Sequence, residues 1–200
     1  MAYDRELFIR KLDRWAKYME NFRLPTWEQL PDMELYMDQV VSLVARYLDL
    51  IPHDEKNPFI TASIINNYVR LKVMPAPVKK RYSRRHLAYV IMICAMKQSL
   101  SLTEIPGILP ADMDDTETAR VYNEFVNRLR VTAMVFVDQV NGIAREELRA
   151  DKPQGCANLV LHSAVSSILY KILTVKLTAL EPAPEEKPED PEAEQEEPKK

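Results

Sequence analysis

The chain has 200 residues, 46% of them apolar, and two cysteines, which excludes both a disordered protein and a disulfide-rich secreted scaffold. Its formal charge is −3, but residues 181–200 alone carry −6 (three lysines against nine acids), so the rest of the chain is mildly basic at +3. We expect a compact cytoplasmic body followed by a disordered acidic tail over 181–200.

The first half of the chain predicts three helices. Apolar residues at three- and four-residue steps indicate an amphipathic helix over 3–21. The capping-box spacing of Thr26 and Gln29 precedes a second predicted helix over 32–50. Thr61 or Ser63 can cap a short third helix that ends near residue 71.

A loop or a very small hairpin is expected next, because the prolines within 73–81 exclude a helix there. Ser83 can cap the following helix, which carries an apolar stripe. The spacing of Ser101 and Glu104 predicts a further, short helix.

Two long helices are predicted at the end of the body, over 116–150 and 158–180. His162, Lys171 and Lys176 interrupt the second, so we interpret it as a buried helix of a protein that does not enter a membrane. A two-helix hairpin cannot bury such a helix alone. It should therefore pack on the N-terminal helices or on a second copy, which would make the chain a homodimer.

These elements predict an all-α fold, because no strand alternates with the helices. We expect a helical N-terminal domain over 1–110, a helical hairpin over 111–180 and the tail. All three glycines lie beyond residue 100, which excludes a glycine-rich phosphate loop.

One segment of this acidic chain is strongly basic. Residues 59–103 contain eight Lys and Arg residues and no acid, and seven of the eight lie within VRLKVMPAPVKKRYSRRHL. A solvated surface usually mixes both signs, so a single sign indicates an anionic partner. Arg84 and Arg85 follow the predicted cap Ser83, at a helix N-terminus that disfavours cations unless an anion is near. The preceding helix presents Asn66 and Asn67, and asparagine can bind adenine through two hydrogen bonds.

The segment ITASIINNYVRLKVMPAPVKKRYSRRHLAYVIMICAMKQSLSLTEI resembles the latter part of a MerR-type winged helix-turn-helix, with a core of about 30–109. Together with LPDMELYMDQV it is similar to an uncharacterised bacterial family, domain of unknown function eighteen thirty-six. The resemblance implies double-stranded DNA as the partner. It implies contacts from the helix over 61–71 and the basic loop over 79–85, namely Ser63, Asn66, Asn67, Tyr68, Arg70, Lys72, Lys79, Lys80, Arg81, Tyr82, Arg84 and Arg85.

Within that resemblance, Tyr68 matches a tyrosine that touches the phosphate backbone, and Tyr82 matches the last tyrosine of the wing. Three features depart from the pattern. Lys72 stands where a glycine is usual, the wing is short and lacks glycine, and the link over 50–59 is long.

Enzymatic activity, a metal and a cofactor are not expected, because the three histidines are scattered and DMDDTE lacks the glycine of a calcium loop. Several methionines could line a pocket for a small-molecule effector, although methionine usually fills cores. The predicted function is a DNA-binding transcriptional regulator. The alternative is a non-enzymatic interaction module whose basic face binds an acidic protein or the chain's own tail.

Overall fold

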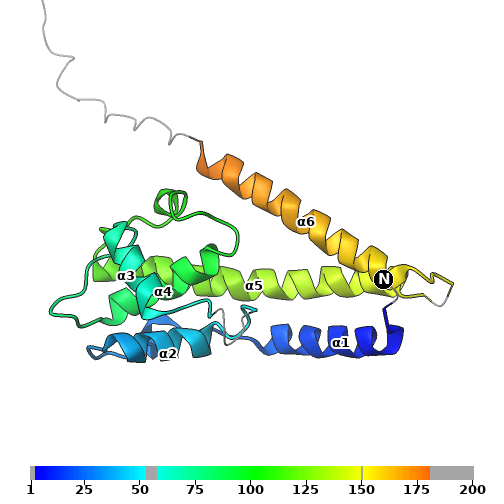
Figure 1. Cartoon of the computed structure of the whole chain (residues 1–200), viewed down its shortest axis with the longest axis horizontal. Helices are drawn as coiled ribbons and strands as arrows, with labels where there is room; N and C mark the ends of the chain where they lie inside the picture. The colour runs from blue at the N-terminus through cyan, green and yellow to red at the C-terminus, as the bar shows by residue number, and fades with distance from the viewer. Residues whose placement is uncertain (1–2, 53–57, 150, 181–200) are drawn as a thin grey trace, which may run out of the picture.

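The computed structural model describes residues 3–52, 58–149 and 151–180, and this part of the chain is all-α, as predicted, without a β-strand. The predicted disordered tail lies outside the described residues. Helix α5 runs along the length of the molecule, with α1 beside one half of it and α2, α3 and α4 gathered around the other half (Figure 1). Helix α6 follows α5 and diverges from it.

Helix α1, Arg5–Asn21, confirms the first predicted helix and starts at a cap, since Asp4 accepts a hydrogen bond of 2.9 Å from the Leu7 amide. It packs along α5. At this contact the rings of Trp15 and Phe136 meet edge to face, with centroids 5.8 Å apart.

The second predicted helix was too long, and its proposed start was wrong. Thr26 and Gln29 close a capping box around a single 3₁₀ turn, η1 (Trp27–Gln29), and α2 spans only Met37–Tyr47. The physical reason is a backbone pairing that sequence reasoning missed. Leu35 exchanges hydrogen bonds of 2.8 and 2.9 Å with Tyr82, which keeps the chain extended until α2 begins.

Helix α3, Ala62–Arg70, starts at Thr61, whose hydroxyl accepts from the Ile64 amide at 3.2 Å, as one of the two predicted caps requires. The following segment is a small hairpin, one of the two forms expected where the prolines exclude a helix. Val78 and Arg81 form an antiparallel bridge around a two-residue turn. Because Arg81 is followed by Tyr82, the pairing with Leu35 ties this hairpin to the segment before α2.

Helix α4, Arg84–Met96, begins after Ser83 as predicted, but it is buried all round and not along one stripe. Every residue from His86 to Cys94 is buried, and α2 and α5 pack against this helix. The predicted helix after Ser101 is reduced to turns and the 3₁₀ turn η2, Ile105–Gly107, although the Ser101 amide does donate to Glu104 at 2.7 Å.

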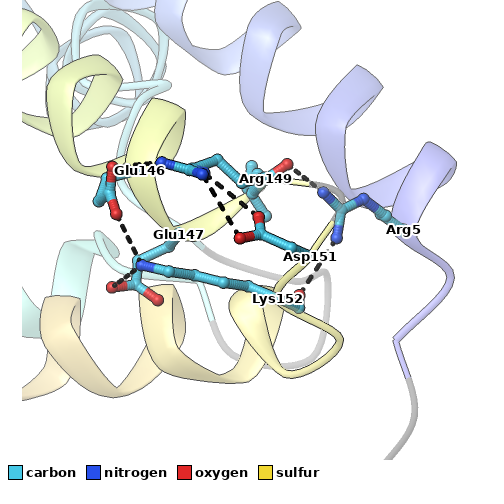
Figure 2. Close-up of polar contacts among 7 residues, drawn as sticks. Arg5, Glu146, Glu147, Arg149, Asp151 and Lys152 are labelled. Carbon is cyan, nitrogen blue, oxygen red and sulfur yellow. Dashed lines mark hydrogen bonds and ion pairs between the residues drawn. The ribbon is translucent and has the colours of Figure 1, made fainter.

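Helices α5, Asp115–Glu147, and α6, Gly155–Thr178, form the predicted hairpin and contact each other. Ion pairs hold the turn between them (Figure 2). The Lys152 ammonium lies 2.9 Å from a Glu146 oxygen and 3.6 Å from a Glu147 oxygen. Arg5 of α1 donates to the carbonyls of Leu148 and Lys152, so the N-terminal helix is joined to this turn.

The prediction that α6 is a buried helix is wrong. Only Gly155, Cys156 and Leu159, all near its start, are buried, because α6 leaves α5 at an angle (Figure 1). Among the described residues, α6 is the one helix long and apolar enough to cross a membrane, with a mean hydropathy of 1.4 and 11% of its most apolar window buried. This criterion concerns length and composition alone.

Candidate nucleic-acid interface

The outer face of α3 carries the residues predicted to read bases. Ser63, Asn66 and Arg70 are exposed and follow one another at helical spacing, while Ile65 and Tyr68 of the opposite face lie in the core. Asn67 is half-buried and accepts a hydrogen bond of 2.6 Å from Arg70. The structure therefore brings Ser63 and Asn66 to the surface together, whereas the Asn67 oxygen is already engaged.

Three lysines of the basic segment adopt left-handed backbone conformations. Lys72, directly after α3, has φ of 56°, and Lys79 and Lys80, which form the hairpin turn, have φ of 49° and 62°. All three side chains are exposed. The left-handed conformation costs a residue with a Cβ roughly 1–2 kcal/mol, whereas glycine adopts it without this cost. Two consecutive positive φ angles belong to a turn that favours Asn-Gly, so the sequence contained no signal for this hairpin turn.

Arg81, at the end of the hairpin, stacks on an aromatic ring. Its guanidinium carbon lies 3.6 Å from the centre of the exposed Tyr36 ring. This contact fixes the direction of the Arg81 side chain at the edge of the basic surface. We define the lysine surface as Arg70, Lys72, Lys79 and Lys80, the exposed cations of α3 and the hairpin.

The predicted phosphate contacts of Tyr68 and Tyr82 do not fit the structure, because both side chains are buried. The Tyr68 hydroxyl lies 3.8 Å from Cys94 Sγ, and burial raises the pKa of Tyr68 and raises the pKa of Cys94 to about 12. Tyr82 pairs with Leu35 and is likewise shielded from water. Both tyrosines are core residues, Tyr68 on the inner face of α3 and Tyr82 at the end of the hairpin.

Arg84, the first residue of α4, is paired with one acid of the protein, Asp32. Its Nη2 lies 3.4 Å from an Asp32 oxygen and its guanidinium carbon 5.6 Å from the Trp27 ring centre. This site opens into a cavity of about 610 Å³ that Glu28 and Asp115 also line. The anion expected to offset the helix dipole is therefore supplied in part by Asp32. Arg85 is also half-buried, so neither arginine belongs to the lysine surface.

His86 has a structural role that sequence reasoning missed. The Ser83 amide donates to His86 Nδ1 at 3.0 Å, and His86 Nε2 lies 3.1 Å from the Ala76 carbonyl, so a neutral imidazole joins the cap of α4 to the loop before the hairpin. Burial lowers the pKa of His86, which keeps the ring neutral. The sequence did contain a signal for this role. His86 stands three residues after the cap Ser83, at the position where glutamate or glutamine usually completes a capping box.

Comparison with known proteins identifies a family for this chain but no activity. A family model described as Domain of unknown function (DUF1836) matches residues 25–125, half of the chain. The match spans η1 to the first part of α5 and includes the whole lysine surface. Neither the curated proteins nor the solved structures contain a match.

Proposed function

The chain belongs to the family described as Domain of unknown function (DUF1836), and we propose that it is a DNA-binding transcriptional regulator of MerR-like type. In this proposal the exposed face of α3 lies in the major groove and reads bases through Ser63 and Asn66. The lysine surface contacts phosphates on either side of the groove. The order of short helix, proline loop, hairpin and capped helix supports this arrangement.

The observation that carries the proposal is the left-handed backbone of Lys72, Lys79 and Lys80. At an exposed position with positive φ, glycine or asparagine would adopt the backbone conformation with less strain than lysine does. A lysine side chain contributes nothing to the packing of an exposed turn, so what it adds there is positive charge. Strained residues with exposed functional groups concentrate at binding sites. Three such lysines, one directly after α3 and two in the hairpin turn, fit a polyanion as partner.

The structure changes the division of roles within the predicted site. Phosphate contacts fall to Arg70, Lys72, Lys79 and Lys80, with Arg81 at the edge. Tyr68 and Tyr82 leave the proposal because they are buried. Arg84 and Arg85 also leave the set of phosphate contacts, because Arg84 is paired with Asp32 and Arg85 is half-buried.

Titration of a fluorescent duplex at increasing salt tests the proposal. Four phosphate contacts predict that the logarithm of the binding constant falls with the logarithm of salt with a slope of about −4, at −0.9 per phosphate. Binding should persist after removal of residues 181–200, whose nine acids would compete with DNA. No binding of duplex at low salt by the truncated chain contradicts the proposal. Tight binding of the separate tail peptide in that case favours the protein-interaction alternative.

A further inference from the structure

A second cavity lies between the segment that follows α1 and the first half of α5. Its volume is about 350 Å³, within the roughly 300–1,000 Å³ of small-molecule pockets. Residues of the stretch 22–29 form one wall, and residues of the stretch 123–130, about two turns of α5, form the other. At about 30 Å³ for each displaced water, the cavity has room for a molecule of roughly a dozen non-hydrogen atoms.

Hydrogen bonds hold the two walls of this cavity together. The Tyr122 hydroxyl donates to the Pro25 carbonyl at 3.0 Å, and the Trp27 amide donates to Asn123 Oδ1 at 2.8 Å. Both bonds join the segment after α1 to α5, and the Tyr122 side chain is fully buried. The cavity is therefore shaped by the fold itself, which lowers the cost of ordering its side chains when a ligand binds.

Part of the lining is apolar. Leu24 is buried, and Phe22, Val126 and Leu129 are half-buried and packed against the hydrophobic core. A ligand that lies on these side chains removes apolar surface from water on both sides of the contact. The lining therefore favours a ligand with an apolar body.

The charged part of the lining has a single sign. Arg23 and Arg130, one from each wall, are exposed, and no Asp or Glu lines the cavity. Within the described residues neither arginine forms an ion pair. Arg23 donates to the Glu20 and Phe22 carbonyls and Arg130 to the Asn127 oxygen, but a guanidinium has five N–H donors. Both therefore keep donors and charge for a ligand.

The neutral amides of the lining also present donors. Gln29 Oε1 already accepts from the Thr26 amide at 2.9 Å, and Asn127 Oδ1 accepts from Arg130 at 3.1 Å. The NH₂ groups of Gln29 and Asn127 have no hydrogen-bond partner in the part of the chain that the structure describes. Donors without partners match a ligand group that accepts hydrogen bonds.

We propose that this cavity binds a small organic carboxylate with an apolar body, whose carboxylate group pairs with Arg23 and Arg130. A guanidinium can bind a carboxylate through two parallel hydrogen bonds. An inorganic anion would leave the apolar lining uncovered, and a cation would be repelled by both arginines. The acidic stretch 181–200 has no apolar side chain larger than alanine, so it does not match the lining either. The inference is independent of DNA binding.

Chemical-shift titration of the ¹⁵N-labelled full chain tests the proposal. The probes are 3-phenylpropionate and octanoate. Each should shift the amide signals of residues 22–29 and 123–130, with a Kd on the order of 1 mM. The matched amine and amide, 3-phenylpropylamine and 3-phenylpropanamide, should bind at least about 10-fold more weakly. Equal binding of the amine, or no shift of these signals by either carboxylate at about 10 mM, overturns the proposal.

Substitution of Arg130 tests the role of its charge. Arg130→Gln should weaken carboxylate binding about 10-fold, and Arg130→Lys should weaken it less. The matched control is Arg128→Gln on the same helix, because Arg128 is exposed, pairs with Glu124 and does not line the cavity. This control should bind both carboxylates as the wild type does. Equal affinities of Arg130→Gln and Arg128→Gln, or shifts confined to the lysine surface, overturn the proposal.

Discussion

A Cβ atom on Gly155 would lie 1.7 Å from the carbonyl oxygen of Glu147, closer than any non-bonded contact allows. The first turn of α6 thus rests directly on the last turn of α5, and Lys152 pairs with Glu146 and Glu147 across the same turn (Figure 2). The direction in which α6 leaves α5 depends on this close approach. Gly155 therefore determines how closely α6 can approach the end of α5.

The first prediction concerns this glycine. Gly155→Ala should destabilise the protein by about 1–3 kcal/mol or more, since the atom that it meets is backbone and cannot rotate away. Thermal unfolding followed by circular dichroism measures the change. The control is Gly142→Ala in the middle of α5, where an added Cβ meets nothing within 4 Å. It should stabilise by about 0.5–1 kcal/mol. Equal stabilities of the two variants would contradict the role of Gly155.

The second prediction separates strain from charge on the lysine surface. Lys72→Gly and Lys80→Gly should each raise the free energy of unfolding by about 0.5–1 kcal/mol, because relief of a left-handed Cβ outweighs the greater entropy of glycine in the unfolded chain. Each should also make the salt slope of duplex binding less steep by about 0.9. Denaturant unfolding and fluorescence titration measure the two effects.

Two controls accompany these lysine variants. Lys11→Gly makes the same substitution inside α1, far from the lysine surface, and should cost about 1 kcal/mol of stability without changing the slope. Arg84→Ala removes one charge that Asp32 already offsets, and should change the slope much less than Lys80→Gly does. If Lys80→Gly raised stability and left binding unchanged, the strained turn would have no connection with DNA.

The third prediction is a pH dependence of stability that originates at His86. Burial is the main cause that lowers the pKa of His86, Arg85 lowers it further, and the Ala76 carbonyl and Asp115 oppose them. The unfolded chain therefore binds a proton at His86 more readily than the folded chain, from a pKa of about 6.5 downward. The free energy of unfolding should be highest above pH 7 and fall by about 1 kcal/mol per pH unit below pH 6.5. The decrease should end at the pKa that His86 has in the folded protein.

His86→Gln isolates this effect, because glutamine three residues after Ser83 can still accept from the cap amide but does not titrate. Melting temperatures between pH 5.5 and 7.5 should vary for the wild type and stay level for the variant. The carboxyls of Glu28, Glu104 and Glu146, whose pKa values lie below the usual range, keep their charge throughout this window. Parallel pH profiles of the two proteins would contradict the role of His86.

Local patterns predicted the elements whose causes lie within a few residues. The caps Thr61 and Ser83 mark the starts of α3 and α4. The prolines correctly excluded a helix over 73–81. Each of these signals acts through the backbone of its own neighbourhood, so no knowledge of the tertiary structure was needed.

The errors arose where distant segments decide the outcome. Pairing of Leu35 with Tyr82 shortens α2, and the two residues lie 47 positions apart in the sequence (82 − 35). The same tertiary packing buries Tyr68 and Tyr82, which a motif read along the sequence places on the surface. Composition likewise suggested that α6 is buried, but composition does not report the angle at which α6 leaves α5.

The last prediction assigns base reading to α3. Asn66 is exposed on the face of α3 that also carries Ser63 and Arg70, whereas the oxygen of Asn67 is held by Arg70. Asn66→Ala should leave the free energy of unfolding within about 0.5 kcal/mol of the wild type, because an exposed side chain is removed. On a duplex selected from a random pool, the same change should cost roughly 1–3 kcal/mol of binding, the worth of two hydrogen bonds to adenine.

Random duplex is the reference for this experiment, since phosphate contacts bind every sequence alike and only base contacts distinguish a selected site. Asn66→Ala should therefore reduce binding to the selected duplex and leave random binding near the wild-type value, while Lys80→Gly should reduce both by the same factor. Opposite behaviour of the two variants would identify α3 as the reading helix and the hairpin as the clamp. Equal losses on both duplexes for Asn66→Ala would show that α3 does not read bases, and the lysine surface would then bind DNA without sequence preference.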